Sequence, residues 1–258
     1  MGNSGLICYT KLSPNHSGQR THAIDRITPH CVVGQLSCET ICDCFPAGRN
    51  ASCNYGIGKD GRISLCVEEK NRSWCSSSNA NDQRAVTIEC ASDKSEPYAM
   101  TNAVYESLVK LCVDICKRNG KKKLLWFGDK AKTLAYNPAA DEMVITVHRW
   151  FVNKSCPGDW LYSRLGDLAA QVTAQLSGFN GTSGSARFPA TPFQVRVIVS
   201  DLNIRKQPCM GNNTTGKYTG KGVFTIVEVK DGWGKLKSGA GWIWLKNSNY
   251  CTVLNTVG

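Results

Sequence analysis

Short stretches of alternating or β-branched apolar residues recur through the first part of the chain and predict strands. The run "CNYGIGKDGRISLCVEE" contains two alternating stretches around Lys-Asp-Gly, a sequence typical of a hairpin turn. The run "RAVTIECAS" is rich in β-branched residues, as a buried strand would be. Strands are thus predicted within residues 20–33, 53–69, 84–92, 123–127 and 142–151.

Helical periodicity appears between these stretches. It is clearest in residues 98–120, which end in Lys117, Arg118 and Gly120, as a helix C-terminus often does. The predicted buried face of this helix consists of Val104, Leu108, Leu111, Cys112 and Ile115.

Two further helices are expected, at residues 36–45 with Ser37 as the N-cap and at residues 158–176, whereas residues 76–83 are expected to be a loop. Helices and strands alternate, so residues 1–177 are predicted to form an α/β domain with a mixed sheet flanked by helices.

The composition changes after this domain. Residues 178–192 are rich in Gly, Ser, Thr and Pro and have no apolar period, which indicates a linker. Residues 193–258 contain short apolar stretches separated by Gly-rich turns and predict a small all-β barrel.

Charge and hydropathy limit the possible partners. The formal net charge of +11 suggests attraction to a polyanion, which the charge alone leaves open between nucleic acid, a membrane surface and an acidic cell wall. The segment from Pro192 onward carries nine Lys/Arg and three Asp/Glu, a net +6. No run of 18 apolar residues exists, so no stable membrane insertion is expected. The N-terminus lacks a signal-peptide pattern, which predicts synthesis in the cytoplasm.

The 14 cysteines are scattered through the chain rather than arranged as a dense disulfide framework. In a reducing compartment most are expected to be buried free thiols. Cys38 with Cys42, and Cys112 with Cys116, are four residues apart and predict core-facing pairs on helices.

The stretch "HRWFVNKSCPG" suggests a metal site. His148 and Cys156 are both good zinc ligands, and a strand end followed by a short loop can bring them to one ion. A catalytic zinc needs a third protein ligand. His30 is the best choice because it also ends an apolar strand, and His22 is held in reserve.

Two charged residues supply the remaining chemistry of such a site. Glu89 follows an apolar strand run, and glutamate is rarely buried without a partner, so it is a candidate general base. Lys154 lies in the same loop as Cys156 and could stabilise an oxyanion. Taken singly, each of these residues is more commonly an ordinary core or surface residue.

Four segments in order, "ITPH", "CNYGIGKDGRI", "NDQRAVTIE" and "VHRWFVNKSCPGDWL", make residues 20–177 resemble the zinc-dependent N-acetylmuramoyl-L-alanine amidases of the type-2 class. That class is related to phage endolysins and peptidoglycan recognition proteins. The resemblance implies zinc (Zn²⁺) held by His30, His148 and Cys156, with Glu89 and Lys154 as catalytic residues. The implied reaction cleaves the amide between N-acetylmuramic acid and L-alanine in peptidoglycan.

The hairpin departs from some relatives of that class. Where they carry a tyrosine near the metal, this chain has Cys53, so no catalytic tyrosine is carried over and Tyr55 is interpreted as structural. Asn54 is a candidate substrate contact.

The last segment resembles a bacterial Src-homology-3-like cell-wall-binding domain through "LNIRKQP", "GKGVFTIVEVKDGWGKLK" and "GWIWL". The resemblance implies that this basic barrel binds the anionic Gram-positive cell wall. The candidate ligand-binding aromatic residues are Trp233, Trp242, Trp244 and Tyr218, with Tyr250 beside them. The alternative is that two or three of them fill a small core.

These observations together predict a peptidoglycan amidase, acting as a phage or prophage endolysin that is released on lysis to act on the wall. Three other functions remain as alternatives. The first is a non-catalytic peptidoglycan-binding protein. The second is a nucleic-acid-binding protein, which no base-reading motif supports. The third is a cysteine peptidase with Cys156 as its nucleophile.

Overall fold

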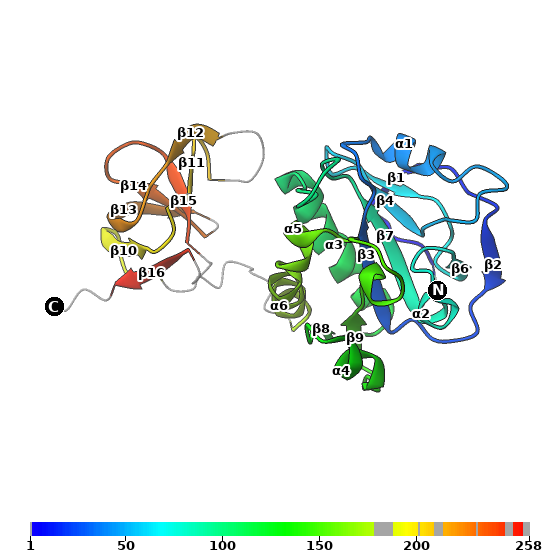
Figure 1. Cartoon of the computed structure of the whole chain (residues 1–258). Coiled ribbons are helices and arrows are strands. Elements are labelled where there is room, and N and C mark those ends of the chain that lie inside the picture. Colours follow the sequence, from blue (N-terminus) through cyan, green and yellow to red (C-terminus); the bar gives the residue numbers. More distant parts are fainter. Residues whose placement is uncertain are drawn as a thin grey trace. The chain divides into compact units, whose positions relative to one another are not determined.

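The computed structural model describes residues 2–177, 188–200, 202–208, 214–230, 232–245 and 250–254. The chain divides into two compact units, Met1–Phe179 and Asn180–Gly258. Each unit has its own hydrophobic core. Figure 1 shows the helices of the described chain in the first unit and a β-only second unit.

The first unit alternates strands and helices, as the sequence predicts. Its strands are β1 (Ile7–Thr10), β2 (His16–Gln19), β3 (Arg26–Cys31), β4 (Tyr55–Ile57), β5 (Ile63–Leu65), β6 (Asn71–Ser73), β7 (Ala85–Cys90), β8 (Lys123–Leu125) and β9 (Glu142–Ile145). Its helices are α1 (Cys38–Asp43), α2 (Asn79–Arg84), α3 (Asn102–Arg118), α4 (Lys130–Ala135), α5 (Asp159–Tyr162) and α6 (Leu165–Leu176), with a 3₁₀ turn at His148–Trp150.

Seven of these strands form one mixed sheet in the order β1-β5-β4-β7-β3-β9-β8. The strands β4, β7, β3, β9 and β8 run parallel to one another, whereas β5 and β1, which are parallel to each other, run antiparallel to β4. The hairpin between β4 and β5 turns at Gly61, whose φ of 86° lies in the left-handed region that glycine tolerates. The predicted α/β fold with a mixed sheet is confirmed.

The two faces of the central strands differ in character. Ile27 of β3 and Val86, Ile88 and Cys90 of β7 belong to the main core, which also contains the buried face of α3 and the apolar side of α6. Because side chains alternate along a strand, Thr28 and His30 of β3 and Thr87 and Glu89 of β7 point to the opposite face. At β3 and β7, one face of the sheet thus packs on the main core and the other carries polar groups, while a smaller apolar cluster lies around α1.

Helix α1 packs against β4 and β5 on the face opposite α3. A Cβ on Gly56 would lie 2.7 Å from Ile41 Cγ2 of α1, so only glycine permits this close approach. Ser37 caps the helix as predicted, since its side chain accepts a hydrogen bond from the Thr40 amide.

Several elements differ from the predictions. Residues 76–83, expected to be a loop, contain most of α2, because Ser78 accepts from the Asn81 amide and caps a short helix. The helix expected at 158–176 is two helices, α5 and α6, separated at Ser163 and Arg164. Strands β1, β2 and β6 and helix α4 were not predicted. The strand before His148 ends at Ile145, and His148 begins the 3₁₀ turn.

The second unit consists of β10 (Phe193–Val197), β11 (Asn203–Arg205), β12 (Thr214–Tyr218), β13 (Gly222–Lys230), β14 (Trp233–Leu236), β15 (Trp242–Trp244) and β16 (Cys251–Leu254). They pair antiparallel in the order β12-β11-β15-β14-β13-β10-β16. The alternation of buried and exposed residues in β10 matches a strand with one face on a core. An all-β C-terminal region is therefore confirmed. Most of the predicted linker lies outside the described residues.

All thirteen cysteines in the described part of the chain are free thiols, and most are buried. Cys38, Cys42, Cys112 and Cys116 are among the buried ones, as their spacing predicted. None of the described helices has the length and apolar character needed to cross a membrane.

Candidate metal centre and active site

His30 and Glu89 lie opposite each other on two neighbouring parallel strands. They are register partners of β3 and β7, and both side chains point to the polar face of the sheet. The His30 Nδ1 and Glu89 Oε1 atoms are 4.0 Å apart. Both residues lie near the carboxyl ends of their strands, where open α/β sheets commonly bind ligands.

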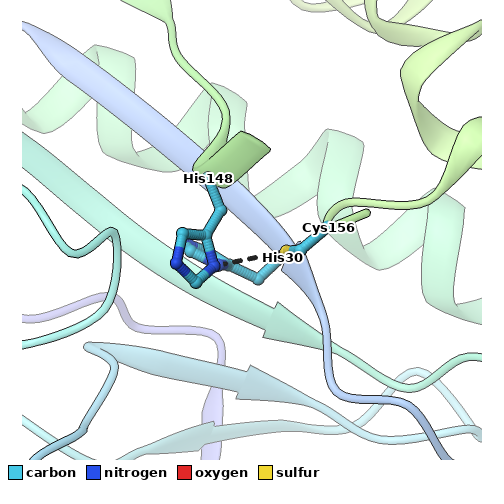
Figure 2. A group of neighbouring side chains, drawn as sticks. All are labelled: His30, His148 and Cys156. Carbon is cyan, nitrogen blue, oxygen red and sulfur yellow. Dashed lines mark hydrogen bonds between the residues drawn. The ribbon is translucent and has the colours of Figure 1, made fainter. Parts of the chain in front are cut away.

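The segment after β9 brings two more donors to this place. His148 begins the 3₁₀ turn, and the chain then folds back so that the Arg149 amide donates to the Cys156 carbonyl over 3.0 Å. The Cys156 Sγ lies 3.3 Å from His30 Nδ1, and the two histidine rings have centroids 5.0 Å apart. Figure 2 shows the three side chains converging from β3, the turn and the returning loop.

The three donors fit a zinc ion. Each offers one ligand atom, and these atoms all lie within 4.8 Å of one another. Tetrahedral bonds of the usual Zn–S and Zn–N lengths separate a sulfur and a nitrogen by about 3.5 Å, close to the 3.3 Å between Cys156 Sγ and His30 Nδ1. Two imidazoles and a thiolate are a donor set typical of catalytic zinc.

The electrostatics favour the neutral form of both histidines, which is the form that binds a metal. Burial and the neighbouring His148 hold the pKa of His30 well below its usual value. Burial and the positive charge of Lys154 lower the pKa of His148. Burial raises the pKa of the Cys156 thiol, so binding a cation there must displace the thiol proton.

Glu89 suits a proton acceptor. Burial raises the pKa of its carboxyl group to about 7, near the range in which a general base works best. Its Oε2 atom is buried and has no hydrogen-bond partner among the described residues. The carboxyl group is therefore available to a water or substrate at the site.

Lys154 lies in the loop that carries Cys156 and is exposed. Its ammonium group is close enough to His148 to lower the pKa of that histidine. The structure therefore brings the three predicted metal ligands and Glu89 together and puts Lys154 in the loop that carries Cys156, and the roles of all five remain predictions.

The turn between β6 and α2 also contacts the site, although no sequence pattern predicted this. The Ser77 Oγ lies 3.1 Å from His148 Nε2, and the Cys75 Sγ lies 3.7 Å from Glu89 Oε1. Ser77 adopts a φ of 61°, which is uncommon for a residue with a side chain. With Nε2 occupied by Ser77, the Nδ1 atom of His148 is left for a metal.

Two predicted residues lie elsewhere. His22, the reserve ligand, is exposed and contacts Thr21 rather than the metal donors. Asn54, the predicted substrate contact, is completely buried, and its side chain bonds to Arg20 and to the Thr87 amide. A buried amide with these partners has no free face for a ligand, so this prediction is corrected to a structural role.

Tyr55 is structural, as interpreted from the sequence, since its buried hydroxyl group donates to Glu69.

The aromatic residues predicted to bind a ligand in the second unit differ in their exposure. Trp233 and Trp242 are only 4% and 8% exposed, and Trp244 is half-buried beside Trp233. Tyr218 is 58% exposed. Trp233 and Trp242 thus fit the alternative in which two of these residues fill the interior. Trp244, Tyr218 and the 38% exposed Tyr250 stay predicted ligand contacts.

A comparison with models of known protein families identifies the family of the chain. The family model for N-acetylmuramoyl-L-alanine amidases matches residues 20–159. This is more than half of the chain, and the chain belongs to that family. The family predicted from the sequence is thus confirmed. The search of curated proteins found no match.

Solved structures of similar chains include PlyL, with 16% identity and a TM-score of 0.42 over 64% of this chain and 95% of that one. The hydrolase AmiA of Staphylococcus aureus, solved with its ligand, has 14% identity and a TM-score of 0.48. The match covers 66% of this chain and 84% of AmiA. The N-acetylmuramoyl-L-alanine amidase LysC of Clostridium intestinale has 14% identity and a TM-score of 0.41. The match covers 63% of this chain and 97% of LysC.

Proposed function

We propose that this chain is a zinc-dependent hydrolase that cleaves the amide bond between N-acetylmuramic acid and L-alanine in peptidoglycan. The observation that carries the proposal is the convergence of His30, His148 and Cys156 beside the buried carboxyl group of Glu89. Family membership supplies the class of reaction.

His30, His148 and Cys156 hold the metal in this proposal. When bound, zinc supplies Lewis-acid chemistry and lowers the pKa of a coordinated water toward roughly 7. Glu89 accepts the proton of the attacking water, because its carboxyl group lies 4.0 Å from His30 Nδ1 and has a pKa near 7. The same carboxyl group, once protonated, can return the proton to the departing amine of L-alanine.

Lys154 stabilises the negative charge that develops on the carbonyl oxygen of the scissile amide. Its side chain is exposed and extends from the loop of Cys156, so it can approach a bound substrate without first breaking a buried contact. Ser77 keeps His148 in the tautomer that presents Nδ1 to the metal.

A cysteine peptidase was the alternative that the Cys156–His30 contact could also support. An activated cysteine nucleophile needs a lowered thiol pKa beside a protonated or readily protonated histidine. Here the pKa of Cys156 is raised and that of His30 is lowered. These shifts disfavour an activated cysteine nucleophile, and the third donor His148 beside the pair supports a metal-ligand role.

The second unit is proposed to anchor the enzyme to the anionic Gram-positive wall as a Src-homology-3-like module. Its segment from Pro192 carries a net +6. A tethered binding module raises the local concentration of the catalytic unit near its substrate. If the attraction is mainly electrostatic, wall binding by the full-length protein weakens as salt rises. Release at lysis, as an endolysin, is the proposed biological setting.

The test is digestion of purified Gram-positive peptidoglycan with product analysis by mass spectrometry. The proposal predicts new α-amino groups on L-alanine and no new reducing sugar ends. Binding to several wall types without any release of L-alanine termini would favour a non-catalytic recognition protein instead.

A further inference from the structure

A second set of metal donors lies beside the first and shares one residue with it. His30, Cys75 and Glu89 each offer a ligand atom, and these atoms also lie within 4.8 Å of one another. The Cys75 Sγ is 3.7 Å from Glu89 Oε1, which is 4.0 Å from His30 Nδ1. The described part of the chain contains two groups of three potential metal ligands, namely this set and the set of His30, His148 and Cys156.

The backbone around Cys75 is firmly held. The Cys75 amide donates to Asp82 Oδ2 over 3.1 Å, and the Ser76 amide donates to both carboxylate oxygens of Asp82 at 3.2 Å. Asp82 is itself buried in α2. Cys75 is therefore presented to Glu89 by an ordered turn, not by a freely moving loop.

The spacing suits a metal ion. Tetrahedral bonds of ordinary length from zinc to a sulfur and a carboxylate oxygen separate those two atoms by about 3.5 Å. The observed 3.7 Å needs only a small adjustment. Thiolate, carboxylate and imidazole are all zinc donors, and the Cys75 thiol would release its proton on binding.

The two sets cannot be filled fully at once. His30 Nδ1 lies 3.3 Å from Cys156 Sγ and 4.0 Å from Glu89 Oε1, so the same nitrogen faces both positions. A neutral imidazole nitrogen has one lone pair and binds one ion. An ion between Cys75 and Glu89 would also occupy the carboxyl group that the proposed reaction needs as its proton acceptor.

We propose that His30, Cys75 and Glu89 form an alternative position for the divalent metal, in which the ion is held by Cys75 and the enzyme is inactive. The inference rests on the proposed function for its consequence in catalysis, but metal binding at Cys75 can be measured without any activity.

The experiment uses full-length protein stripped of metal and titrated with Co²⁺, whose bonds to thiolates absorb in the near ultraviolet. The variants are Cys156→Ser, Cys75→Ser and the double variant, with the exposed Cys8→Ser as a matched control. The proposal predicts that Cys156→Ser keeps a cobalt–thiolate band at reduced affinity and that the double variant loses it. Cys8→Ser should match the wild type.

Absence of a thiolate band in Cys156→Ser that still folds, as judged by circular dichroism, would overturn the proposal. An equal cobalt–thiolate band in Cys156→Ser and in the double variant would also overturn the proposal, because the thiolate that binds Co²⁺ would then not be Cys75. Wild-type protein that binds no Co²⁺ at all would instead refute the proposed function.

A second measurement does not depend on the stability of Cys156→Ser. In His148→Ala the first set of donors loses one ligand, so zinc should bind at Cys75 instead. Bound zinc should slow the reaction of the Cys75 thiol with iodoacetamide. Mass spectrometry of peptides measures how much of Cys75 is alkylated. Exposed Cys8 provides the internal reference and should react at the same rate with and without zinc. Equal alkylation of Cys75 in both conditions would contradict the alternative position.

Discussion

His30 and Glu89 are direct neighbours across two parallel strands, and their side chains meet on the polar face of the sheet at a distance of 4.0 Å. Strand register therefore sets the distance between the proposed metal site and the proposed base, without help from a flexible loop.

Replacement of Lys154 by alanine tests the proposed oxyanion contact. Loss of one such charge typically lowers the rate by about 10²–10³-fold. Because Lys154 is not among the metal donors, zinc content measured by mass spectrometry should remain that of the wild type. Lys110→Ala, an exposed lysine on α3, is the matched control and should keep full activity. Zinc lost together with activity in Lys154→Ala would refute the assigned role.

Removal of the Ser77 hydroxyl group tests whether it holds His148. Loss of a hydrogen bond to a metal-bound histidine commonly weakens metal affinity by about 10–100-fold. We expect this weakening in both Ser77→Ala and Ser77→Gly, measured by competition with a chromophoric chelator. Ser77→Ala removes only the hydroxyl group, whereas Ser77→Gly removes the whole side chain but tolerates the φ of 61°, so Ser77→Gly controls for backbone strain in Ser77→Ala. Wild-type affinity in Ser77→Gly would show that the contact is not needed.

The buried carboxyl group of Glu89 should make the stability of the metal-free protein depend on pH. Its pKa is raised from 4.5 to about 7 in the folded chain, so the folded state binds a proton that the unfolded chain has already released. The free energy of unfolding should therefore fall as pH rises from about 4.5 to 7, in total by on the order of 3 kcal/mol from this group.

Urea unfolding of chelator-treated protein at a series of pH values measures this effect. Glu89→Gln removes the titrating group and should flatten the profile in that window. An unchanged slope in Glu89→Gln would mean that another group causes the dependence.

The ion pair of Arg118 and Glu69 should be important for stability. Glu69 is completely buried and accepts from Arg118 over 2.5 and 2.6 Å and from the Tyr55 hydroxyl group. Arg118→Ala leaves this carboxylate buried without its cation and should lower the free energy of unfolding by about 3 kcal/mol.

Arg62→Ala provides the comparison for Arg118→Ala. Arg62 pairs with Glu39 and Asp60 at the surface, where ion pairs contribute little, so its variant should unfold almost like the wild type. Chemical denaturation measures the free energy of unfolding of both variants. An equal loss in Arg118→Ala and Arg62→Ala would contradict the claim that the buried ion pair contributes more than the exposed one.

The sequence was sufficient for the features that follow from strand alternation. His30 and Glu89 each end or nearly end an apolar strand, and parallel strands place such residues at one edge of a sheet. His148 and Cys156 were predictable as candidate ligands because both are residue types that bind zinc and they lie within one short segment. The helix α3 was predictable because its apolar face is long and periodic.

The rest depends on contacts between segments distant in the chain. Cys75 and Ser77 approach the site because the buried carboxylate of Asp82 holds the intervening turn, and no local pattern indicates this. Asn54 was misassigned because its burial is set by partners such as Arg20 and Thr87. Strand β2 was missed because its residues are polar and it pairs only with the short β6.

The most direct test of the central claim is the titration of amidase activity with zinc. Metal-stripped protein is incubated with peptidoglycan while zinc is added in fractions of one equivalent, and the release of N-terminal L-alanine is followed by mass spectrometry. The account predicts no release without metal and recovery as zinc approaches one equivalent, in the wild type and in Cys8→Ser. Full release by protein shown to be free of metal would contradict it.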